Sequence, residues 1–92
     1  MTKEQRTEVY NKITLVFSER EQIHKAVEEL LELALALQKM DRVNITEEMA
    51  DVKVMIEQLE MIFDNEKFVN EMMTRKVERT IERYNLNSIE IL

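Results

Sequence analysis

The sequence carries two acidic pairs whose spacing could hold a divalent cation. Glu29 and Glu32 form an E-x-x-E pair, and Glu48 and Asp51 form an E-x-x-D pair. Residues three apart on a helix are neighbours on one face, so each pair would present two carboxylates side by side. Carboxylate oxygens are the ligands that Mg²⁺ and other hard cations prefer. Spacing alone is weak evidence, because a chain this acidic produces a similar number of such pairs by chance.

The helical position of the second pair strengthens the case. At about 100° per residue, Glu48 lines up with an apolar stripe, which consists of Val52, Met55, Leu59 and Ile62. Asp51 lies at the edge of this stripe. A carboxylate in a buried stripe is unfavourable unless it is neutralised, paired or bound to a metal. The alternative is that Glu48, close to the start of its helix, reaches water as part of a solvated acidic face.

The first pair belongs to the preceding helix, on the side opposite its expected apolar stripe. That stripe consists of Ile23, Val27, Leu30, Ala34 and Leu37. Residues 33–37, however, are apolar nearly all round, and a helix of that kind is buried on every side. We therefore expect the face carrying Glu29 and Glu32 to meet a second contact surface, on the last helix or on a second subunit.

The two pairs lie on either side of one short loop, which favours a shared site. Helices joined by a short loop usually pack antiparallel, so the four carboxylates could face each other. Ionised carboxylates that converge repel one another, and a bound Mg²⁺ relieves that repulsion. A di-iron site would expect Glu-x-x-His pairs, and the single histidine, His24, is not part of one.

A basic stretch near the end of the chain could bind phosphates. Lys76, Arg79 and Arg83 fall on one helical face, and Lys25 lies close to the first acidic pair. Lysine and arginine are the usual phosphate ligands, arginine with two parallel donors. The alternative is that these cations only form ion pairs with neighbouring glutamates.

Composition limits the classes of protein that fit. The 92 residues suit one domain, 1–92, with a thin core, and the chain has no Gly, Pro or Cys. Good helix formers dominate, which predicts long helices joined by short polar links. The net charge of −6 disfavours nucleic-acid partners. We expect no membrane partner and a cytoplasmic location, because neither a spanning segment nor a signal peptide is evident.

The pattern predicts an all-α fold of four helices. The first covers 3–17, and an S-x-x-E capping box at Ser18 starts the second, which runs to 40. Residues 41–45 are expected to form a loop, with Thr46 capping a third helix that runs to 63. After a link at 64–65, in which Asn65 is a candidate N-cap, a fourth helix runs to 84. Asn85 is expected in the left-handed position that ends it, and 86–92 to pack on a neighbour or fray.

Two segments resemble the MazG-like all-alpha NTP pyrophosphohydrolase superfamily. They are K-A-V-E-E-L-L-E-L-A from Lys25 and I-T-E-E-M-A-D-V from Ile45. The E-x-x-E and E-x-x-D pairs fall inside these segments, as in that family, and the likeness covers roughly 15–83. The chain departs from the family pattern at two positions. Thr80 lies in the basic helix where relatives often have an asparagine, and Leu31 replaces the small residue that is often found inside the E-x-x-E pair.

This resemblance implies a fold, an activity and a set of site residues. It implies a four-helix, MazG-like bundle completed by oligomerisation to a homodimer or homotetramer. The implied reaction is Mg²⁺-dependent cleavage of a nucleoside triphosphate to a nucleoside monophosphate and pyrophosphate. The metal ligands would be Glu29, Glu32, Glu48 and Asp51. Glu29 or Glu32 would also activate the water. Phosphates would be held by Lys25, Lys76, Arg79 and Arg83.

Two other functions compete with this interpretation. One is a non-catalytic helical oligomerisation or interaction module, in which the glutamates form a solvated face. The other is a different small helical enzyme, such as an all-helical chorismate mutase, which would need a cationic pocket that the acidic helices do not offer. No linear motif in the sequence indicates which base or sugar the nucleotide would carry.

Overall fold

The computed structural model describes residues 1–89, and this range contains helices but no strand. The elements are α1 (Lys3–Val16), α2 (Glu19–Lys39), α3 (Arg42–Phe63), α4 (Glu66–Tyr84) and a short 3₁₀ turn at Leu86–Ser88. The prediction of an all-α chain with four helices is confirmed. None of the helices described is long and apolar enough to cross a membrane. The end of the predicted tail, 90–92, lies outside the described residues.

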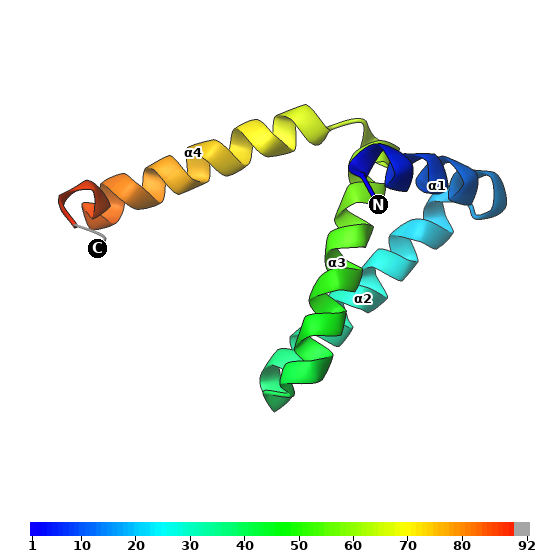
Figure 1. Ribbon diagram of the computed structural model, residues 1–92, viewed down its shortest axis with the longest axis horizontal. Helices are drawn as coiled ribbons and strands as arrows, with labels where there is room; N and C mark the ends of the chain where they lie inside the picture. The colour runs from blue at the N-terminus through cyan, green and yellow to red at the C-terminus, as the bar shows by residue number, and fades with distance from the viewer. Residues whose placement is uncertain (90–92) are drawn as a thin grey trace.

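The antiparallel pair of α2 and α3 forms the centre of the molecule (Figure 1). Helix α1 crosses one end of this pair, whereas α4 extends away from it as an arm. The radius of gyration is 16.5 Å, against roughly 12 Å for a compact chain of this length. The expected four-helix bundle is therefore not closed within one chain, because α4 does not return to cover α2 and α3.

The start of α2 follows the prediction. The Ser18 hydroxyl accepts a hydrogen bond from the Glu21 amide at 3.1 Å, and the Glu21 carboxylate accepts one from the Ser18 amide at 3.2 Å. A second capping box, at Thr2 and Gln5, begins α1. Each box satisfies two amides that would otherwise lack an acceptor at a helix start.

The predicted loop at 41–45 is wrong, because α3 begins at Arg42. Asp41 is the N-cap, and its carboxylate accepts a hydrogen bond from the Asn44 amide at 3.3 Å. Met40 and Asp41 are the only residues between the two helices, and Met40 adopts the left-handed conformation with φ 55°. Thr46 is therefore inside the helix, where its hydroxyl donates to the Arg42 carbonyl at 3.1 Å.

The remaining helix ends agree with the sequence patterns. Asn85 adopts the predicted left-handed conformation after α4, and Asp64 adopts the same conformation after α3. Asn65 is the N-cap of α4, although its side chain makes no capping hydrogen bond. In a chain without glycine, non-glycine residues must take these left-handed positions, at some cost in backbone energy.

The predicted apolar stripe of α2 is wrong, because the most buried face of this helix combines two polar side chains with two alanines. The buried residues of α2 are Gln22, Ala26, Glu29 and Ala36. Val27, Leu30 and Leu37 are each about half exposed. The small side chains of Ala26 and Ala36 let this face approach α3 closely. The stripe on α3 is confirmed, since Met55 is buried and Val52, Leu59 and Ile62 are half-buried.

Helix α1 is attached to α3 through one carboxylate. Arg6 donates to both oxygens of Glu57, at 2.8 Å from Nε and 3.0 Å from Nη2. The Tyr10 hydroxyl donates to Glu57 Oε1 at 2.7 Å. The hydrogen bond from Arg6 is the main reason that the pKa of Glu57 is lowered. Burial and the Glu57 carboxylate raise the pKa of Tyr10.

We predict that Glu57→Gln loosens α1 and lowers the melting temperature by roughly 5 °C at pH 7. The folded pKa of Glu57 lies below the ordinary 4.5, so its contribution is full above that pH and is lost as pH falls through the lowered pKa. The melting difference between wild type and variant, followed by circular dichroism from pH 8 to pH 3, should shrink below pH 4.5. Glu8→Gln, an exposed site on α1, is the control, and an equal effect there would contradict this role.

Candidate metal centre

Three carboxylates from α2 and α3 converge near the middle of the helix pair. One oxygen each of Glu29, Glu48 and Asp51 lies within 4.8 Å of the other two. Glu29 projects from the buried face of α2, and the other two come from the first half of α3. They are neighbours because α2 and α3 run antiparallel from the tight turn at Met40. The structure thus brings together three of the four predicted metal ligands, hereafter the carboxylate cluster.

Two oxygens of this cluster lack a hydrogen-bond partner. Oε2 of Glu29 and Oε2 of Glu48 are buried, and neither has a partner within residues 1–89. Glu29 itself is only 7% exposed. Its other oxygen, Oε1, lies 3.1 Å from Nζ of Lys25. A buried carboxylate oxygen without a donor is unfavourable, and a divalent cation is the kind of ligand that would satisfy both oxygens together.

Glu32 lies at the margin of the cluster. It is exposed and does not belong to the set of three, but it lies next to Glu48. Burial first, and then the neighbouring carboxylates of Glu32, Asp51 and Glu29, raise the pKa of Glu48. Its contact with the Glu32 carboxylate favours the protonated form of Glu48. All three of the other predicted carboxylates therefore act on the pKa of Glu48.

The predicted phosphate-binding residues divide into two sets. Lys25 lies beside the cluster, and its contact with Glu29 is the main reason that its pKa is raised. Lys76, Arg79 and Arg83 are exposed on α4, which extends away from the helix pair (Figure 1). Within one chain the structure does not bring these three cations to the cluster.

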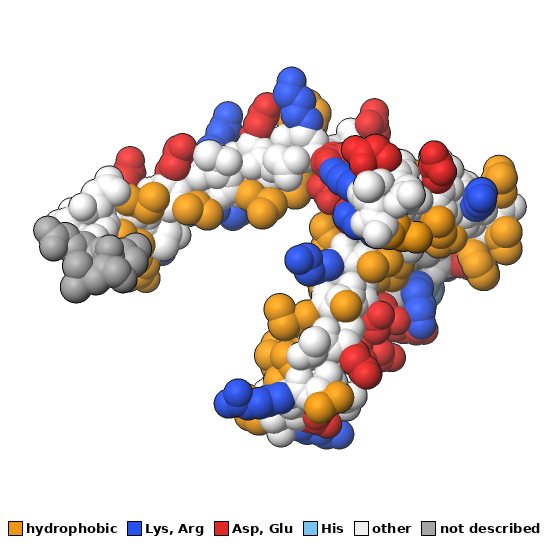
Figure 2. Space-filling view, in the orientation of Figure 1, with side chains coloured by type: hydrophobic (Ala, Val, Ile, Leu, Met, Phe, Trp, Pro, Cys, Tyr) orange, Lys and Arg blue, Asp and Glu red, His pale blue; other side chains and the backbone are white. Residues whose placement is uncertain are grey.

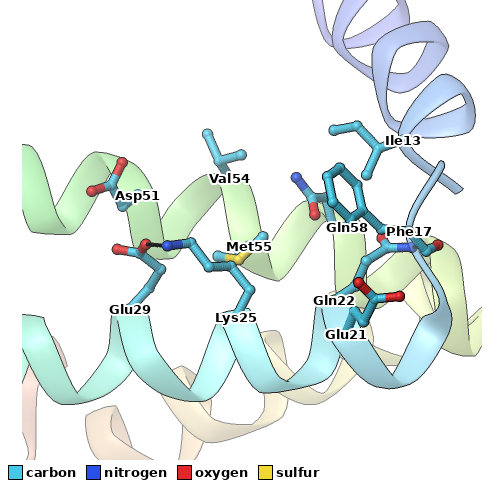
Figure 3. Close-up of a pocket in the computed structure, with 10 residues that line it drawn as sticks. All are labelled: Ile13, Phe17, Glu21, Gln22, Lys25, Glu29, Asp51, Val54, Met55 and Gln58. Atoms are coloured by element: carbon cyan, nitrogen blue, oxygen red, sulfur yellow. Dashed lines mark hydrogen bonds and ion pairs between the residues drawn. The ribbon is translucent and has the colours of Figure 1, made fainter.

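A groove of about 510 Å³ begins at the cluster and runs between α2 and α3 toward α1. Glu29, Asp51 and Lys25 lie at one end, and Ile13 and Phe17 lie at the other (Figure 3). Two buried glutamines, Gln22 and Gln58, line it as well.

Sequence reasoning missed these glutamines, although a signal was present. Gln22 precedes Glu29 by seven residues, and Gln58 follows Asp51 by seven. Seven residues are close to two helical turns, so each glutamine shares a face with a carboxylate of the cluster. If Glu29 and Asp51 line the groove, the seven-residue spacing implies that the side-chain amides of Gln22 and Gln58 line it too.

Comparisons with models of known protein families, with curated proteins and with solved structures find no match to this chain. What the site does must therefore be inferred from its own residues and geometry.

We predict that Glu48→Gln stabilises the metal-free protein at pH 7 and removes its response to Mg²⁺. Because the folded pKa of Glu48 is raised above 4.5, the metal-free protein loses stability as pH rises from that value through the raised pKa. Glutamine at position 48 has no charge, so it removes the cost of ionising a buried carboxylate, and it also removes one of the proposed metal ligands. In the wild-type protein, Mg²⁺ at ten times its dissociation constant should raise the free energy of unfolding by about 1.4 kcal/mol.

Thermal melts with Mg²⁺ and with a chelator measure both effects. Glu47→Gln, the adjacent exposed glutamate, should behave as wild type. An unchanged Mg²⁺ shift in Glu48→Gln would remove Glu48 from the metal site.

Proposed function

We propose that this protein is a Mg²⁺-dependent nucleoside triphosphate pyrophosphohydrolase, MazG-like in its chemistry. It would cleave a (d)NTP to a (d)NMP and pyrophosphate, and so act on cytoplasmic nucleotide pools. The observation that carries the proposal is the convergence of Glu29, Glu48 and Asp51, with two buried carboxylate oxygens that have no partner. These residues occupy the positions that the resemblance to the MazG-like family marks as metal ligands.

The chemistry of the donor set fits Mg²⁺. All the ligands are carboxylate oxygens, and the cluster is reached from a groove that leaves room for phosphates and water, the partners that Mg²⁺ usually retains. When bound, Mg²⁺ would neutralise the triphosphate charge and lower the pKa of a water molecule. Glu29, Glu48 and Asp51 would hold it, with Glu32 at the margin.

The chain's own residues would handle the substrate and the proton. A water molecule attacks the α-phosphorus, the bond between this phosphorus and the α–β bridging oxygen breaks, and pyrophosphate leaves. Glu29 is already engaged by Lys25, whereas Glu32 is exposed and outside the cluster. Glu32 is therefore the better-placed general base to take the proton of the attacking water. Lys25, at the groove, would contact a phosphate.

A second copy of the chain would complete the site. Large apolar side chains are exposed on α2 and α4, including Leu31, Leu35, Phe68 and Val77. Figure 2 shows apolar side chains along the side of α4 that faces the helix pair. Large apolar side chains exposed in this number are typical of a protein interface. Self-association through α4 would bring Lys76, Arg79 and Arg83 of one copy toward the acidic cluster of another, with complementary charge.

The exposed apolar surface also favours a second candidate, a non-catalytic helical oligomerisation or interaction module. Such a module would account for the exposed residues of α2 and α4. It gives no reason for a buried carboxylate oxygen without a partner at Glu29, because an apolar residue would pack there with less penalty. The two candidates differ in their response to Mg²⁺ and nucleotide.

We predict that Glu48→Gln reduces pyrophosphate release from a panel of NTPs and dNTPs at least 100-fold, through loss of a metal ligand. A coupled pyrophosphate assay with Mg²⁺ and with a chelator measures this effect. Glu47→Gln is the matched control and should keep wild-type activity. Wild-type turnover by Glu48→Gln, or turnover that persists with the chelator, would exclude the proposed metal centre.

We also predict that two inactive variants restore activity when mixed. Glu48→Gln lacks a functional cluster, whereas the double variant Lys76→Ala/Arg79→Ala lacks the cations of α4. If each site uses a cluster from one copy and cations from another, random mixing into dimers should restore about a quarter of the sites. The chains are denatured together, refolded and assayed for pyrophosphate. A mixture no more active than either variant would show that the α4 cations do not act across the interface.

A further inference from the structure

The groove that begins at the carboxylate cluster changes character along its length. Its first end carries Glu29, Asp51 and Lys25, which suit a metal-bound polyphosphate. Two helical turns further, roughly 10 Å along α2, it is lined by Ile13, Phe17 and two amides, with the exposed carboxylate of Glu21 at its margin (Figure 3). The Glu21 carboxylate already accepts a hydrogen bond from the Ser18 amide. A ligand that fills the groove therefore has an anionic end and a second end that carries no negative charge and is largely apolar. A nucleotide has this division between its phosphates and its base.

Gln22 has a side-chain oxygen that accepts no hydrogen bond within the described residues. Its side-chain Nε2 donates to the Phe17 carbonyl at 3.2 Å, which fixes the orientation of the amide, since only the nitrogen can donate to a carbonyl. The opposite oxygen, Oε1, is buried and has no partner within the described residues. Gln22 as a whole is 5% exposed. A ligand that brings an N–H into the groove would supply the missing donor after a small rotation about the soft terminal torsion.

Gln58 presents the second amide from α3. It is 6% exposed, lines the same groove beside Phe17 (Figure 3), and takes part in no side-chain hydrogen bond within residues 1–89. Its amide atoms are not among the buried atoms that lack a partner, so they can be reached from the groove, where a ligand that offers both a donor and an acceptor could pair with them. Neither glutamine carries a charge, Met55 and Val54 are apolar, and the Glu21 carboxylate nearby disfavours an anion. These residues therefore favour an uncharged group that carries both N–H donors and carbonyl or ring-nitrogen acceptors, and Phe17 favours a planar one.

We infer that the amide end of this groove binds the nucleobase of the substrate, with Gln22 accepting from a base N–H, Gln58 pairing with the adjoining edge and Phe17 providing an aromatic surface. This inference rests on the proposed function, to which it adds base recognition. Glutamine amides pair with base edges through adjacent donors and acceptors, and aromatic side chains pack against base faces. Two glutamines at 22 and 58 thus become specificity-determining residues.

The side-chain amide signals of Gln22 and Gln58 in ¹⁵N-edited NMR spectra report on this site directly. We expect α,β-imido analogues of the NTPs, added with Mg²⁺, to shift both signals. Inorganic tripolyphosphate with Mg²⁺ should leave them unmoved and should bind at least tenfold more weakly than the preferred nucleotide. Equal affinity for tripolyphosphate and all nucleotides, with unmoved amide signals, would overturn base recognition while leaving the proposed reaction intact.

Free nucleosides at millimolar concentration, without Mg²⁺, separate the two proposals. They lack phosphates, so their effect on the amide signals does not depend on the metal centre. Shifts with a nucleoside would support the base site even if no triphosphate were hydrolysed. Amide signals that move on dilution of the protein alone, and not with any nucleoside, would assign the groove to a side chain of a second copy and overturn the inference.

Gln58→Met keeps the buried volume and removes the amide, and Gln22→Met does the same on α2. Each variant should lose about tenfold of the preference for nucleotide over tripolyphosphate, with the affinity for tripolyphosphate unchanged. The control is Gln38→Met, at an exposed position near the far end of α2. If Gln22→Met fails to fold, the test rests on Gln58→Met alone. An undiminished preference for nucleotide over tripolyphosphate in that variant would contradict a nucleobase site at the amide end of the groove.

Discussion

The burial of Glu29 between α2 and α3 is the constraint on which the rest of the structure depends. This carboxylate occupies a position in the helix interface where an apolar side chain would cost less, and one of its oxygens has no partner. Lys25 neutralises only the other oxygen. The antiparallel packing then sets Glu48 and Asp51 against it, which adds repulsion to burial. The buried part of this interface therefore combines a carboxylate and two amides with only a few apolar side chains, among them Ala26, Ala36 and Met55.

The interface between α2 and α3 buries few large apolar side chains, so many of them are exposed on the outer surface. Since α2 turns its face with Gln22 and Glu29 toward α3, its larger apolar residues, such as Val27 and Leu30, point outward. Helix α4 has no buried residue and extends as an arm. A chain of 92 residues has a thin core in any case, and here much of its apolar surface is left for contacts outside the single chain. The exposed apolar side chains of α2 and the buried Glu29 thus have one cause, which is the face that α2 turns toward α3.

Helix number and most helix ends could be predicted from local chemistry. The capping box at Ser18 and the left-handed Asn85 depend on hydrogen bonds within a few residues, which the sequence displays directly. The sequence does not predict the start of α3, because Met40, a residue type that seldom adopts a left-handed turn, allows Asp41 rather than Thr46 to cap the helix. The sequence does not predict the buried face of α2 either, because hydrophobic periodicity assumes that the larger apolar side chains are buried. The convergence of Glu29 with Glu48 and Asp51 can be predicted, since it depends on helix direction and spacing. The glutamines of the groove required knowledge of which face of each helix meets the other.

The most direct test of the central claim is to identify the bond that is cleaved. The protein would be incubated with a nucleoside triphosphate and Mg²⁺ in ¹⁸O-labelled water, and the products followed by ³¹P NMR and mass spectrometry. Attack at the α-phosphorus predicts pyrophosphate and a nucleoside monophosphate that carries the label. Label in inorganic phosphate with release of a nucleoside diphosphate, or no product from a folded protein supplied with Mg²⁺, would contradict the assignment of this carboxylate cluster to pyrophosphohydrolysis.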